Sequence, residues 1–62
     1  MPPRITTEQA ESVEQMGTWV LENPDLPFEE VVRKYIGEFP KTTDGRAFAR
    51  ACKKVFDRER KA

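Results

Sequence analysis

The chain has 62 residues, of which 37% are apolar and 35% are charged, and its formal net charge is zero. A chain of this length holds one domain with one modest core, which we expect to span residues 1–62. The composition is too apolar for a disordered segment, and no apolar run reaches the roughly 18 residues of a transmembrane helix.

Residues 7–22 carry a helix start signal followed by apolar residues at helical spacing. Thr6 and Gln9 fit a capping box, in which each side chain bonds the backbone amide of the other residue. The Asn-Pro-Asp turn at 23–25 ends the predicted helix near Glu22. Its apolar stripe consists of Ala10, Val13, Met16, Gly17, Val20 and Leu21.

The second predicted helix covers residues 27–38. Pro27 is tolerated because a first helical turn does not need its amide, and Gly37 and Pro40 bracket the end of the helix. Its apolar face consists of Phe28, Val31, Val32, Tyr35, Ile36 and Phe39.

The third predicted helix covers residues 43–60, after an N-cap at Thr42 or Thr43. Its apolar stripe holds Phe48, Ala51, Cys52 and Val55, with Phe56 at the edge. We expect Cys52 to be a small buried hydrophobe. Because the connections are short, consecutive helices pack together. The sequence therefore predicts an all-α protein, a compact three-helix bundle of the helix-turn-helix (trihelical) kind.

Charge is distributed unevenly along the chain. Residues 1–40 carry eight acids and three bases, whereas residues 41–62 carry eight bases and three acids. On a helix, six bases of the third segment fall within an arc of roughly 120°, opposite the apolar stripe. We call this set the basic ridge: Arg46, Arg50, Lys53, Lys54, Arg60 and Lys61.

The basic ridge predicts contact with DNA, because bases along one helix neutralise phosphates and a helix fits the major groove. The last helix of a helix-turn-helix motif reads DNA, and Thr42, Thr43 and Arg46 near its start would lie closest to it. The alternative is a solvated face that complements the helix dipole, with Asp57 and Glu59 as local partners. The zero net charge favours that alternative, since DNA-binding domains are usually basic.

An acidic first helix with a tryptophan, followed by a basic third helix, resembles the trihelical homeodomain-like and Myb-like modules over about residues 6–58. The resemblance implies three helices and a third helix that contacts DNA. The third helix lacks the aromatic-plus-asparagine signature of homeodomains and the spaced tryptophans of Myb repeats, so no family residues are carried over.

Trp19 supports a second hypothesis, a protein-interaction module or a small inhibitor or adaptor. On an ideal helix it lies about 180° from Ala10, outside the apolar stripe. If exposed, the ring would anchor a partner; a bend at Gly17 or the following turn would instead cover it. The acidic first half would then meet a basic protein or a second copy of the chain.

Catalysis and metal binding lack their usual side chains. The chain has no histidine, the commonest general base and metal ligand, and its only serine, Ser12, has no base to activate it. We therefore expect no enzyme activity, metal, cofactor or small-molecule substrate. A membrane-surface or calmodulin-binding role for the third helix is disfavoured, because the core needs its apolar strip. Without a signal peptide, we expect a cytoplasmic protein, or a nuclear one in a eukaryote, with no membrane partner.

Overall fold

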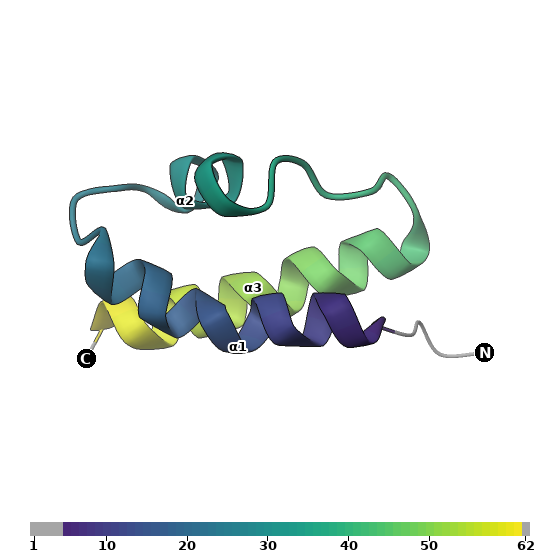
Figure 1. Cartoon of the computed structure of the whole chain (residues 1–62), viewed down its shortest axis with the longest axis horizontal. Coiled ribbons are helices and arrows are strands. Elements are labelled where there is room, and N and C mark those ends of the chain that lie inside the picture. Colours follow the sequence, from purple (N-terminus) through teal and green to yellow (C-terminus); the bar gives the residue numbers. More distant parts are fainter. Residues whose placement is uncertain (1–4, 62) are drawn as a thin grey trace.

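A computed structural model describes residues 5–61, which form three α-helices and contain no β-strand (Figure 1). The helices are α1 (Thr7–Glu22), α2 (Phe28–Tyr35) and α3 (Thr43–Lys61). Helices α1 and α3 lie side by side and run in the same direction, and α2 covers one side of the pair. The predicted all-α, three-helix architecture is confirmed. The helix-turn-helix geometry stays a prediction, because residues 36–42 form a longer connection than that motif's turn of about 3–4 residues.

Two helix starts are set by threonine side chains, as the sequence predicts. The Thr6 hydroxyl accepts a hydrogen bond from the Gln9 amide at 3.1 Å, and the Thr6 amide donates to Gln9 Oε1 at 3.0 Å. At α3 the Thr42 hydroxyl accepts from the Gly45 amide at 3.0 Å, so Thr42 is the N-cap. Each cap stabilises its helix by about 1 kcal/mol.

Helix α2 ends earlier than predicted, at Tyr35 and not at residue 38. The amides of Ile36 and Gly37 both donate to the Val32 carbonyl, at 2.8 and 2.7 Å. Gly37 has a φ of 100°, a left-handed conformation that ends a helix and that glycine adopts without strain. The apolar residues beyond Tyr35 therefore lie on the connection 36–42, which packs against the helices and which we call the linker.

The buried core takes side chains from all three helices: Met16, Val20, Val31, Val32, Phe48, Cys52 and Phe56. Met16, Val31 and Cys52, one from each helix, are fully buried. The prediction that Cys52 is buried is confirmed. Burial raises the pKa of its thiol to about 11, so the sulfur is protonated at neutral pH and unsuited to nucleophilic chemistry.

The predicted α1 stripe is too wide, since Ala10 and Leu21 are exposed, the latter by 68%. Consecutive residues of a helix point about 100° apart. Because Val20 points into the core, Leu21 points past α3 into solvent. The part of the α1 surface that the other helices cover is therefore narrower than the apolar stripe predicted from its sequence.

Four phenylalanine rings form a continuous row that joins α3, α2 and the linker. The Phe28 ring lies 5.3 Å from Phe56 and 6.2 Å from Phe39, and the Phe39 ring lies 5.2 Å from Phe48, measured between centroids. Edge-to-face and offset pairs at such distances each add about 0.5–1.5 kcal/mol beyond burial. The row fixes Phe39, and with it the linker, against α3.

Gly45 permits the linker to cross the first turn of α3 at close range. The residue is buried, and a Cβ at this position would lie 2.7 Å from the Pro40 carbonyl carbon and overlap the carbonyl oxygen. Gly17, by contrast, has room, since a Cβ there would meet only the flexible Glu59 side chain at 3.7 Å.

We expect the two glycines to respond to alanine in opposite directions. Gly45→Ala should lower the free energy of unfolding by about 2–3 kcal/mol, because Pro40 must move away. Gly17→Ala should raise it by about 0.5–1 kcal/mol, the usual gain of alanine within a helix. Urea unfolding followed by far-ultraviolet circular dichroism measures both. Equal stability of Gly45→Ala and wild type would contradict the close contact at Pro40.

Candidate functional site

Helix α3 buries one side and exposes the other along its whole length. Its buried residues are Gly45, Phe48, Cys52 and Phe56. Every member of the basic ridge is exposed: Arg46, Arg50, Lys53, Lys54, Arg60 and Lys61. Two of these six side chains, Lys53 and Arg60, contact other groups of the protein, and the other four form no ion pair or hydrogen bond among residues 5–61.

Lys53 and Arg60 are held by contacts within the protein. The Lys53 ammonium lies 5.1 Å from the Phe28 ring, 5.2 Å from the Phe56 ring and 3.3 Å from an Asp57 carboxylate oxygen. The Arg60 guanidinium lies 4.4 Å from the Phe56 ring and donates to the Leu26 carbonyl at 2.8 Å. Cation–π contacts of this kind contribute about 0.5–1 kcal/mol at exposed sites, so both bases tie α3 to α2 and its preceding turn.

Three of the remaining ridge bases form, together with Arg58, a row on the outer side of α3 in which each base lies four residues after the last. We call it the outer basic row: Arg46, Arg50, Lys54 and Arg58. Positions four apart lie one above the other on a helix, so these side chains share one ridge. Arg58 lies outside the arc drawn from the sequence, although its four-residue spacing from Lys54 could have identified it.

The outer basic row has no counter-charge within the part of the chain that the structure describes. Among residues 5–61, no ion pair or hydrogen bond joins its four side chains, or that of Lys61, to another residue. Asp57 is paired with Lys53, and Glu59 lies beside Gly17 on the α1 side of the helix. The expectation that Asp57 is a local partner of the basic ridge is thus confirmed at Lys53, and neither acid pairs with the outer basic row among residues 5–61.

A shallow hollow runs beside the outer basic row. It has a volume of about 260 Å³ and is lined by Ala47, Arg50, Ala51 and Lys54. The two alanines expose the helix backbone to close approach, and the two bases stand above them. A negatively charged backbone can reach α3 here without displacing a large side chain.

The two threonines predicted to lie near DNA have different roles at the start of α3. The Thr42 hydroxyl already accepts the Gly45 amide as the helix cap. Thr43 is exposed in the first helical turn, next to Asp44, and precedes Arg46 by less than one turn. Thr43 is thus the better placed of the two for contact with a ligand of α3.

Trp19 is half-buried and covered by α2. Its ring stacks on Tyr35, with centroids 4.6 Å apart and planes at 4°. The Asn23 side-chain amide donates to the Trp19 carbonyl at 2.8 Å and to the Tyr35 hydroxyl at 2.7 Å, and Lys34 donates to Asn23 Oδ1 at 2.9 Å. The cluster joins the end of α1 to α2. A partner-anchoring role for Trp19 stays a prediction.

Trp19→Ala tests how much of this ring is structural. We expect it to lower the free energy of unfolding by about 2–3 kcal/mol, because it removes the stack on Tyr35 and opens the junction of α1 and α2. Chemical unfolding by circular dichroism measures the change. Unchanged stability would show that the ring contributes little to packing and would favour the partner-anchoring role.

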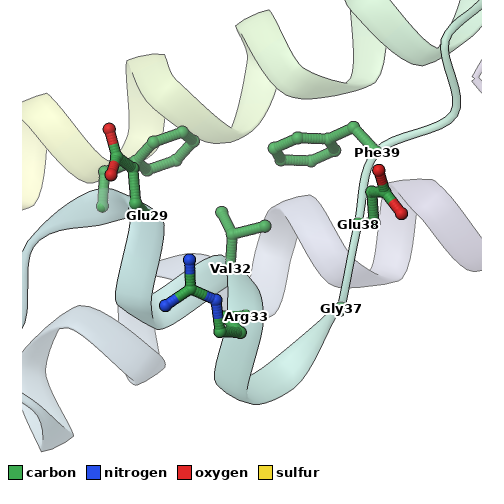
Figure 2. Close-up of a pocket in the computed structure, with 7 residues that line it drawn as sticks. Glu29, Val32, Arg33, Gly37, Glu38 and Phe39 are labelled. Atoms are coloured by element: carbon green, nitrogen blue, oxygen red, sulfur yellow. The ribbon is translucent and has the colours of Figure 1, made fainter.

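A second hollow, which was not predicted from the sequence, lies between α2 and the linker (Figure 2). We call it the α2 hollow. Its volume is about 280 Å³. The apolar walls are Phe28, Val32 and Phe39, and the charged rim is Glu29, Arg33 and Glu38. The hollow exists because Gly37 turns the linker back along α2, which brings Phe39 opposite Val32.

Residues 5–61 contain no group of three or more cysteine, aspartate or glutamate side chains placed to hold a metal ion. None of the described helices is long and apolar enough to cross a membrane. Comparison of the chain with protein-family models, curated proteins and solved structures finds no match.

Proposed function

We propose that this protein is a small, non-enzymatic, regulatory domain that binds DNA through the outer basic row of α3. The supporting observation is a row of four exposed bases, Arg46, Arg50, Lys54 and Arg58, without counter-charges among residues 5–61. Bases that hold no internal partner gain most from meeting phosphates, because binding releases the counterions condensed on DNA.

The shape of α3 supports duplex DNA as the ligand. A helix with its side chains is about 10–12 Å across, which matches a major groove about 12 Å wide. Ala47 and Ala51 keep the side of α3 next to the row shallow. The four bases of the row then contact phosphates along the groove, and Thr43 lies close to the DNA at the helix start.

The acidic residues of the chain set the strength of this binding. Eight of the eleven acids precede residue 41, on α1, α2 and their connections. They leave α3 basic but bring the net charge to zero, so long-range attraction to DNA is weak. We expect a dissociation constant in the micromolar range at low salt, with little sequence preference. Such a domain acts where DNA is, in the cytoplasm or, in a eukaryote, the nucleus.

Titration of a mixed-sequence DNA duplex at about 50 and about 200 mM salt tests the proposal. With four phosphate contacts, the logarithm of the DNA association constant should fall with the logarithm of the salt concentration with a slope of about −3.6. This corresponds to roughly 100-fold weaker binding at the higher salt. Arg50→Gln with Lys54→Gln should about halve that slope and weaken binding at low salt at least tenfold. Fluorescence anisotropy of a labelled duplex measures both quantities.

A matched control changes the net charge equally at bases that already have partners. Arg33→Gln with Lys53→Gln removes the partners of Glu30 and Asp57. This double variant should leave the slope of the DNA association constant against salt concentration unchanged. Equal loss of binding in both double variants would mean that only net charge matters. No binding by the wild type at low salt would refute the DNA proposal outright.

A further inference from the structure

The α2 hollow combines an apolar interior with a negative rim. Figure 2 shows Glu29, Val32 and Arg33 on α2, and Glu38 and Phe39 across the hollow on the linker. Arg33 is already neutralised, since its guanidinium lies 2.7 Å from the Glu30 carboxylate. Glu29 and Glu38 have no ion pair with any residue of 5–61. The uncompensated charge at the rim is therefore negative.

The volume of the α2 hollow sets the size of its occupant. At about 280 Å³ it lies just below the roughly 300–1,000 Å³ range of small-molecule sites. The space suits one large side chain from another chain. Its interior is apolar on three sides, from Phe28, Val32 and Phe39, so burial of an apolar side chain there is favourable.

The aromatic wall already accepts a cation from within the protein. Lys53 of α3 lies 5.1 Å from the Phe28 ring, so the electron-rich face of this ring is used by an ammonium group. A second cation at the rim would meet Glu29 and Glu38. Nucleic acid is disfavoured at this place, because its phosphates would meet the same carboxylates.

We propose that the α2 hollow docks a partner protein through a basic segment that carries one large apolar side chain. The apolar side chain enters between Val32 and Phe39, and flanking lysines or arginines pair with Glu29 and Glu38. Charge complementarity selects this occupant, since an acidic or neutral segment gains nothing from the rim. The proposal is independent of DNA binding, which uses the opposite charge on α3.

A labelled peptide with one tryptophan flanked on both sides by lysines is the probe. We expect it to bind the wild-type protein with micromolar to submillimolar affinity. Glu29→Gln with Glu38→Gln should weaken binding about fivefold or more, whereas Glu11→Gln with Glu14→Gln, two exposed acids of α1, should change it less than about twofold. In a ¹H–¹⁵N spectrum the peptide should shift the Val32, Gly37 and Phe39 amides most.

Two control peptides separate the apolar and charged parts of the docking site. Replacement of the tryptophan by glycine, or of the lysines by glutamates, should each abolish detectable binding. Equal binding of the glycine peptide, or equal losses in the two double variants, would overturn the proposal, because attraction would then be general and not located at the hollow. Concentration-dependent self-association that shifts the same amides would also overturn it in favour of a second copy. DNA binding by the Glu29→Gln, Glu38→Gln variant should be at least as strong as that of the wild type, because the outer basic row is intact and two acids are removed.

Discussion

The close contact between the Pro40 backbone and Gly45 is the constraint on which both candidate surfaces depend. Because position 45 carries no side chain, the linker crosses the first turn of α3 at van der Waals distance. That crossing places Phe39 against Phe48 and Phe28, which closes the α2 hollow on its linker side. It also fixes the rotation of α3 about its own axis, so Phe48 and Cys52 face inward and the outer basic row faces solvent.

The bases of α3 fall into two sets with different surroundings. Lys53 and Arg60 lie over phenylalanine rings, and they join α3 to α2 and to the turn before it, respectively. Arg50 and Lys54, further around the same exposed face, have no such contacts among residues 5–61. An ion pair between two exposed side chains contributes little to the free energy of unfolding. The absence of partners therefore costs the fold little and leaves these charges free to meet a ligand.

Local signals in the sequence were sufficient for the helices, their caps and the burial of Cys52, because those features depend on neighbours within one or two turns. The features that the sequence missed depend on distant contacts. A covered Trp19 was one of two alternatives, but the ring that covers it, Tyr35, lies on the next helix and was not identified. Leu21 is exposed because α3 covers a narrow arc of α1. The α2 hollow follows from the positive φ of Gly37. The end of α2 was misjudged for a local reason: the backbone turns at Gly37 and the helix ends at Tyr35, although apolar residues continue beyond it.

The most direct measurement of the central claim is a ¹H–¹⁵N spectrum of the protein titrated with a short DNA duplex at low salt. Duplex DNA on the outer basic row should shift the amides of Ala47, Arg50, Ala51 and Lys54 together. Those of Met16 in the core, and of Val32 and Phe39 at the α2 hollow, should stay in place. Shifts confined to α1 or α2, or a spectrum unchanged by excess DNA, would contradict the assignment of α3 as the DNA-binding surface.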